Sequence, residues 1–269
     1  MNNTTLRLCI DALEVLGPGL PGWSASRPIL AGETSYQPEP VTLQPPPQLS
    51  PAERRRTVPS VRLALSVGSA AIAQSGHDPG ELLAVFASSG ADGDTIAGIL
   101  AALNTPTHEV SPTRFHNSVH NAPSGYWSLA THSREASTSI SCHDFTFAAG
   151  LLEAGVQAIS HDRPVLLVAY DLPYPSPLHE VRPITGIFGI AMVVRPAPLS
   201  GCSTQLALSF AEAAEAEPDS CAVDGLEALR RGNPAARALP LLTQLARNEP
   251  SMVRLELFRG ALEARVHVA

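Results

Sequence analysis

The residues best able to do chemistry lie in one polar block in the middle of the chain. Its first part, Val110 to Gly125 (VSPTRFHNSVHNAPSG), is rich in histidine and asparagine, and its last part is Cys142-His143-Asp144. A cysteine with a nearby histidine base can form a covalent acyl intermediate. Histidines grouped with a carboxylate can instead bind a transition metal. The block therefore allows two kinds of active site.

A cysteine-based enzyme would use Cys142, with His143, His116 or His120 as the base. The chain would then be a stand-alone Cys-His acyltransferase or thioesterase. Residues that are adjacent on a turn rarely point at one another, so His143 is a poor base for Cys142. The pattern favours the competing interpretation, a structural cysteine buried at the end of a strand.

A metal site would draw on five polar side chains of the block, namely His116, His120, His132, His143 and Asp144. The spacing of His116 and His120 suits one face of a helix. Asn121, Pro123 and Gly125 follow at once, however, and they predict an irregular segment. Surface or capping histidines are the favoured interpretation, so we expect no metal and no organic cofactor.

Composition removes other mechanisms. All 18 basic Lys+Arg residues are arginine, so the chain has no lysine for a Walker-A loop, a Schiff base or a Ser-x-x-Lys motif. The net charge of −7 and the pI of about 5.7 argue against a nucleic-acid partner. Charged residues make up only 16% of the chain, which hints that a partner covers part of the surface.

Cysteine usage and hydropathy predict a cytoplasmic protein with reduced thiols. The cysteines Cys9, Cys142, Cys202 and Cys221 contain no C-x-x-C pair. The first residues lack the pattern of a secretory signal. The longest apolar stretch, Gly186 to Val194, is far shorter than the roughly 18 residues that a membrane span requires.

The elements that must position the block follow an α/β pattern. Residues 4–15 predict a strand, and the proline-dense stretch 17–59 predicts an extended arm or long surface loop. Within it, Ser50-Pro51-Ala52-Glu53 predicts the start of a helix. The stretch 61–76 predicts a helix that ends at Gly76, residues 81–89 a buried strand, and residues 95–103 a helix.

The end of the polar block has the pattern of a strand, a sharp turn and a helix. Residues 137–141 are β-prone, Cys142-His143-Asp144 form the turn, and residues 145–159 have apolar side chains at helical spacing. The free N–H groups at such a helix start favour anions and lower the pKa of a thiol. Buried strands are expected at 164–170 and 185–194.

The C-terminal third is less regular. Residues 206–217 and 226–231 are expected to be helical, and residues 235–247 form a further helix that Pro240 interrupts or starts. Residues 253–258 and 262–268 alternate apolar and polar residues around Gly260, which predicts an antiparallel hairpin.

Five of these blocks, in this order, resemble the N-terminal half of the β-ketoacyl synthases. They are the helix after Arg54-Arg55-Arg56, AVFASSGADGDTI, VSPTRFHNSVHNAPSGYWSLA with Ser111, Pro112, Asn121 and Gly125, STSISCHDFTFAAGLLEAG with Glu153-Ala154, and TGIFGIAMVV. The resemblance implies an α/β, thiolase-like layered fold that is truncated in its C-terminal half. We expect one ketosynthase-like domain over 1–269, matched best over 50–195 and reduced over 196–269.

The chain departs from the synthases where their chemistry lies. Alignment on Glu153-Ala154 places Asp144 at the position of the nucleophilic cysteine, with His143 and Cys142 before it. The synthase lysine has no counterpart, and beyond His179 the only histidine is His267. The condensing machinery is therefore incomplete, and no catalytic residue is expected. Asp144 is expected to cap the helix by accepting backbone N–H bonds.

Together these features are similar to chain-length factors, in particular those of aryl polyene clusters. The resemblance implies a subunit without intrinsic activity that pairs with a true ketosynthase as a heterodimer and meets the acyl carrier protein only indirectly. It would shape the acyl tunnel in polyene, polyketide or fatty-acid-type elongation. The candidate tunnel or interface residues are Phe115, His116, Asn121, Tyr126, Trp127 and Phe145. The three aromatics Phe115, Tyr126 and Trp127 are the candidate gates, although ordinary core packing explains them as well.

Overall fold

The protein is described by a computed structural model covering residues 5–198, 202–212 and 217–268. Its strands form one eight-stranded mixed sheet in the order β3-β2-β4-β5-β1-β6-β8-β7. Strand β2, next to the edge strand β3, runs parallel to β3 and β4, and the other neighbours are antiparallel. The strands are β1 Leu6–Leu16, β2 Leu83–Ala87, β3 Ser137–Ile140, β4 Val165–Asp171, β5 Phe188–Pro196, β6 Thr204–Glu212, β7 Ser251–Leu257 and β8 Gly260–Val268.

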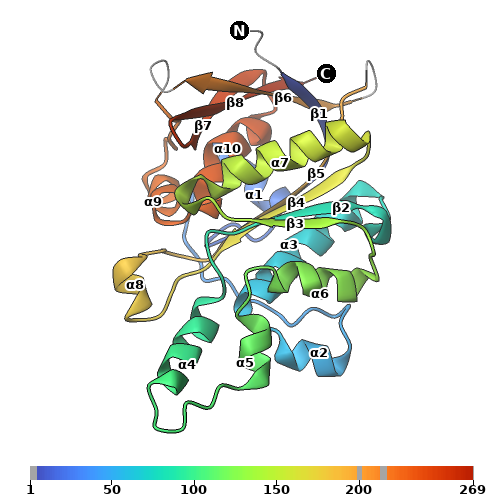
Figure 1. Cartoon of the computed structure of the whole chain (residues 1–269). Helices are drawn as coiled ribbons and strands as arrows, with labels where there is room; N and C mark the ends of the chain where they lie inside the picture. Colours follow the sequence, from blue (N-terminus) through green and yellow to red (C-terminus); the bar gives the residue numbers. More distant parts are fainter. Residues whose placement is uncertain (1–4, 199–201, 213–216, 269) are drawn as a thin grey trace.

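Helices cover both faces of the sheet (Figure 1). The α-helices are α1 Trp23–Ala31, α2 Pro51–Arg56, α3 Pro59–Ser75, α4 Gly93–Leu103, α5 Pro112–Asn117, α6 Ala122–Thr131, α7 Thr146–His161, α8 Leu178–Val181, α9 Asp224–Gly232 and α10 Leu239–Arg247. Three 3₁₀ turns, η1 Pro79–Glu81, η2 His143–Phe145 and η3 Ala235–Ala238, complete the described elements.

Two hydrophobic clusters hold these layers together. One joins α7, η3 and α10 to one face along the whole sheet. The other joins α3 and α6 to the opposite face, over β1, β2, β4 and β5. All seven residues of β4 are buried as a result, whereas buried and more exposed residues alternate along β7. A strand buried on both faces reads as a continuous apolar run, and one buried on a single face alternates.

Local signals placed several elements correctly. The Ser50 hydroxyl accepts a hydrogen bond from Glu53 N and caps α2. Helix α3 ends at Gly76, which has the left-handed φ of 73°. The predicted hairpin is β7 and β8, paired from Ser251 opposite Val266 to Leu257 opposite Gly260. These features depend on neighbours in sequence, which is why they could be predicted.

Three predictions were wrong. The proline-rich stretch contains α1, which tolerates Pro28 in its interior. The polar block is not irregular, because it forms α5 and α6, each with proline in its first turn, where the missing N–H costs little. The predicted helix at 206–217 is strand β6 up to Glu212, paired with β1 and β8. Residues 213–216 of that prediction lie outside the described part.

The expectation of reduced thiols is also wrong for two of the cysteines. Cys9 of β1 and Cys202, just before β6, form a disulfide with their Cα atoms 5.9 Å apart. Both residues are buried. Cys142 and Cys221 are free thiols. In the described ranges, no helix is both long and apolar enough to cross a bilayer.

Candidate functional site

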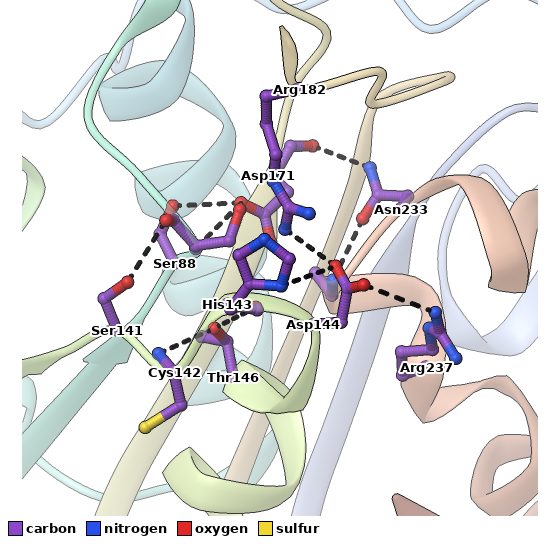
Figure 2. Close-up of polar contacts among 12 residues, drawn as sticks. Ser88, Ser141, Cys142, His143, Asp144, Thr146, Asp171, Arg182, Asn233 and Arg237 are labelled. Atoms are coloured by element: carbon purple, nitrogen blue, oxygen red, sulfur yellow. Dashed lines mark hydrogen bonds and ion pairs between the residues drawn. The ribbon is translucent and has the colours of Figure 1, made fainter. Parts of the chain in front are cut away.

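The candidate site lies where three parallel strands end. The carboxyl ends of β2, β3 and β4 meet at one edge of the sheet, beside the N-terminus of α7. This edge is where open α/β sheets place their ligands. Figure 2 shows Ser88, Ser141, His143, Asp144 and Asp171 gathered there, with Arg182, Asn233 and Arg237 brought in from later in the chain.

The turn between β3 and α7 is tight and self-bonded. His143 has a left-handed φ of 53°, unusual for a residue other than glycine. The Thr146 hydroxyl accepts a hydrogen bond from Cys142 N at 3.0 Å and donates one to the His143 carbonyl at 2.6 Å. Such a strained strand-to-helix turn presents one side chain above the sheet. The left-handed residue is His143, one position before Asp144.

The Asp144 carboxylate is held by arginine side chains. Its Oδ1 lies 2.7 Å from Nη2 of Arg182, and its Oδ2 lies 3.8 Å from Nη2 of Arg237. The His143 Nδ1 is 3.6 Å from Oδ1. Among the described contacts, Asp144 accepts no backbone N–H, so its predicted role as a helix cap is wrong. It ties the turn to the α8 loop and to η3 instead.

Cys142 is poorly placed for nucleophilic chemistry. Burial raises the pKa of its thiol, which is opposite to the lowering expected at a helix start. Its side chain packs against the hydrophobic cluster under α7. Figure 2 shows its sulfur directed away from the His143 ring. The thiol therefore stays protonated near neutral pH.

The histidines of the polar block do not converge. His120 Nε2 lies 2.9 Å from the Ser88 carbonyl oxygen. His116 contacts the Tyr126 ring edge-on, with centroids 5.8 Å apart. His132 ends α6 with a left-handed φ of 56°. Over the described part of the chain, no group of three or more His, Cys, Asp or Glu residues is arranged to hold a metal ion.

The candidate gate residues lie in different surroundings. Phe115 on α5 is 68% exposed, whereas Tyr126 and Trp127 on α6 are buried in the core, Trp127 against Phe86. Phe145 packs against Phe258, with ring centroids 5.4 Å apart. The remaining candidate, Asn121, begins α6, and its carbonyl accepts a bond from the Ser124 hydroxyl.

Asp171, at the end of β4, is the most strongly perturbed acid of the site. Its Oδ1 accepts bonds from Ser89 N at 2.9 Å, Ser89 Oγ at 2.7 Å and Ser88 Oγ at 3.3 Å. Burial raises its pKa to about 7, although these bonds and the Arg182 charge act in the opposite direction. Its buried Oδ2 has no hydrogen-bond partner.

Asn233 ties the C-terminal part to this edge. Its side-chain amide donates to the carbonyls of Asp171 at 3.1 Å and Gly186 at 3.0 Å. Its Oδ1 accepts from the backbone N–H groups of Ala235 and Ala236 at the start of η3. Asn233 is fully buried with both ends of its amide satisfied, which fixes η3 and therefore Arg237 against the turn.

Sequence reasoning missed four of these residues, namely Asp171, Arg182, Asn233 and Arg237. Only Asp171 carried a usable signal, an acid at the very end of an apolar strand that leads to the ligand-binding edge of a parallel sheet. The other three come from loops and turns far along the chain.

Comparisons with known structures confirm the fold. A ketosynthase, ApeO, in complex with its chain length factor, ApeC, from Xenorhabdus doucetiae matches at TM-score 0.70 and 20% identity, over 97% of this chain and 99% of that one. The ishigamide ketosynthase/chain length factor matches at TM-score 0.70 and 12% identity, over 96% and 98%. These similarities confirm the ketosynthase-like, thiolase-like α/β fold.

Longer ketosynthases are matched only in part. For ketosynthase twelve of the bacillaene synthase from Bacillus amyloliquefaciens, the TM-score is 0.58 and the identity 12%, over 79% of this chain and 46% of that one. This coverage agrees with the predicted truncation of the chain in its C-terminal half relative to such ketosynthases. No curated protein matches the sequence. Residues 23–252 match the family described as beta-ketoacyl synthase, N-terminal domain, and the chain therefore belongs to that family.

Proposed function

We propose that the chain is a ketosynthase-like subunit without catalytic activity, of the chain-length-factor type, which pairs with a complete ketosynthase. One observation carries the proposal. The turn that would present the nucleophile holds His143 and Asp144, and the Asp144 carboxylate is ion-paired with Arg182 and Arg237. A carboxylate held in ion pairs with two arginines cannot serve as the thiolate that accepts the acyl group.

Neither Cys142 nor a lysine supplies another acyl acceptor. The Cys142 thiol has a raised pKa and faces the hydrophobic cluster. The chain has no lysine. Nucleophilic catalysis needs a nucleophile within reach of an activating base. The site is better suited to holding the turn rigid than to transferring an acyl group.

A partner would meet the β3 side of the molecule. Strand β3 is the last strand in the sheet order, so it is paired along one side only, with β2. An unpaired strand edge readily accepts another strand. A second candidate contact region is α4–α5, which bears the exposed apolar side chains Leu100, Leu103, Phe115 and Val119. Two of the similar solved structures are pairs of a ketosynthase and a chain length factor.

Phe115 is our candidate for the residue that limits acyl length. It is the exposed aromatic of α5, and the buried Tyr126 behind it contacts His116 of the same helix. Truncation of an exposed aromatic would widen a tunnel without emptying the core of this chain. The acyl carrier protein would dock on the partner, and the complex would act in the cytoplasm on polyene, polyketide or fatty-acid-type chains.

Co-expression with a complete ketosynthase from the same organism tests the proposal. We expect the two chains to co-purify and to elongate an acyl chain only together. Phe115→Ala should keep the complex and lengthen its products, as read by mass spectrometry. Phe210→Ala, a half-exposed phenylalanine on β6, is the control and should leave product length unchanged.

The same material tests the cysteine alternative. If the isolated chain is acylated by an acyl thioester, and Cys142→Ser abolishes the adduct while Cys221→Ser does not, the non-catalytic proposal is wrong. Both cysteines are free thiols of intermediate exposure, so Cys221 is a matched control.

A further inference from the structure

Two buried carboxylates face one small cavity beside the candidate site. Asp171 ends β4 and is 3% exposed, and Asp92 caps α4 and is 7% exposed. Both line a cavity of about 10 Å³, together with Ser60, Ser88, Gly90 and Tyr174. That volume admits a single water-sized sphere. The cavity lies between the β2–α4 loop and the loop that follows β4.

The oxygens of the two acids are unequally satisfied. Asp92 Oδ1 accepts from Thr95 N at 3.0 Å and Thr95 Oγ1 at 2.8 Å, and its Oδ2 accepts a long bond of 3.3 Å from Ser60 N. Asp171 Oδ2 is buried and has no hydrogen-bond partner. A buried acceptor without a partner is costly, so it points to a further group in the cavity.

The charge of this pocket is not balanced by the side chains around it. Burial raises the pKa of Tyr174, the charges of Asp171 and Asp92 raise it further and the Arg182 charge lowers it, so both carboxylates act on the same place. Arg182 is the cation that acts on Asp171, and it already contacts Asp144. The chain has no lysine whose compact ammonium could enter the cavity. A small external cation would supply the missing charge.

We propose that this cavity binds one monovalent alkali cation, Na⁺ or K⁺, between Asp171 and Asp92. The lining supplies carboxylate and hydroxyl oxygens, the ligands that hard cations prefer. Mg²⁺ retains several waters, for which the cavity has no room. The sequence pointed to four histidines and Asp144 as candidate metal ligands and not to Asp92 or Asp171, because these two acids lie far apart along the chain.

The cation would hold the β2–α4 loop in place, and this loop contacts the segment beside the Cys142-His143-Asp144 turn. Ser88 and Ser89 bond Asp171, and the Ser89 carbonyl accepts a hydrogen bond from Ser141 Oγ beside the turn. The Ser88 carbonyl also contacts His120 of the polar block. The site thus connects β4, the β2–α4 loop and the turn, independently of whether the chain acts as a chain-length factor.

Thermal unfolding in different chlorides tests the proposal. The full chain is measured at pH 8 and constant ionic strength in lithium, sodium, potassium or tetramethylammonium chloride. We expect Na⁺ or K⁺ to raise Tm by at least about 2 °C over tetramethylammonium, with saturation as the ion replaces it. Equal Tm values in all four salts would mean that the cavity holds only water, and the proposal would be overturned.

Variants locate the effect. Asp171→Asn keeps the size of the side chain but offers an amide in place of one carboxylate oxygen, so it should abolish the difference between salts. Asp162→Asn, at the exposed end of α7, should retain it. If Asp171→Asn retains the difference, the ion binds elsewhere. Should that variant fail to fold, ²³Na relaxation on the wild-type protein tests for a bound ion that K⁺ displaces, and the absence of such a relaxation effect would overturn the proposal.

Discussion

Asp171 at the candidate site and Glu227 on α9 are acids in opposite electrostatic surroundings. Asp171 accepts hydrogen bonds from uncharged serine groups, and burial raises its pKa to about 7. Glu227 accepts bonds of 2.7 Å from Arg230 and Arg231 and one of 2.9 Å from Cys221 N. Chiefly through the Arg230 bond, its pKa is lowered to about 2.

The difference shows what compensates a carboxylate that is removed from water. Asp171 accepts three hydrogen bonds and Glu227 accepts four, but Asp171 is the more deeply buried of the two and its charged form is disfavoured. Hydrogen bonds from neutral donors offset only part of the desolvation cost, whereas a nearby guanidinium offsets it directly. Arginines therefore offset the carboxylate charge of Glu227, far from the candidate site, whereas the charge of Asp171 beside the site is only partly offset. Such perturbed acids are common at functional sites.

The largest effect should come from removing a charge partner of Glu227. Arg230→Met removes a cation that is itself only 10% exposed and leaves the Glu227 carboxylate, whose side chain is 15% exposed, with the solvent-exposed Arg231 as its remaining arginine partner. We expect a loss of about 3 kcal/mol in the free energy of unfolding, measured with urea. Arg231→Met is the matched control. That side chain also bonds Glu227 but is 73% exposed, so its loss should cost under about 1 kcal/mol.

A second test compares pH profiles of wild type and Asp171→Asn. A carboxyl whose pKa is raised in the folded state lowers the stability of the protein as pH rises from the ordinary pKa of 3.8 to the folded value of about 7. The amide cannot ionise, so the variant should gain about 2 kcal/mol relative to wild type between pH 5 and pH 8. Urea unfolding in tetramethylammonium chloride measures this without alkali ions. A constant difference across that range would contradict the raised pKa.

Glu227 predicts the opposite pH dependence. Its lowered pKa contributes stability that is present above about pH 4.5 and is lost as pH falls towards 2. Glu227→Gln should remove that part of the acid sensitivity and leave the profile between pH 5 and pH 8 unchanged. The acid limbs of the two unfolding curves provide the measurement. If the variant has the same acid limb as wild type, the pKa of Glu227 is not lowered.

The smallest effect is expected at the turn itself. Asp144→Asn breaks the ion pair with Arg182 and the longer one with Arg237, while Arg237 keeps its 2.8 Å contact with Glu256. Because one third of the Asp144 side chain is exposed, solvent screens the pair and the cost should be about 1 kcal/mol or less. Urea unfolding checks this, with Glu256→Gln as the control for the other half of the network.

The elements that could be predicted are those whose signal is local. The continuous apolar runs of β4 and β5 and the alternation of β7 and β8 follow from burial on two faces or on one. Strand β6 was missed because the alanine-rich stretch 206–217 favours a helix, while pairing with β8 along the whole strand and with β1 over residues 205–208 favours a strand. Tertiary pairing outweighs such weak propensities.

For the site, the turn was predicted and its partners were not. The strand, Cys142-His143-Asp144 and helix α7 are contiguous, so their pattern is visible in sequence. Arg182, Asn233 and Arg237 reach the turn only because β4, β5 and η3 pack beside it. The Cys9–Cys202 disulfide was missed for the same reason, since its cysteines are 193 residues apart.

The sequence by itself determined the α/β class, the family resemblance and the position of the turn, because residue types and short-range periodicity carry them. It also excluded every lysine-based mechanism. Only the tertiary structure decided which charges meet. It paired Asp144 with two arginines, gave Glu227 its guanidinium partners and left Asp171 with one buried oxygen unpaired. Electrostatic energy depends on distance in space and on burial, and neither is encoded in the spacing of residues along the chain.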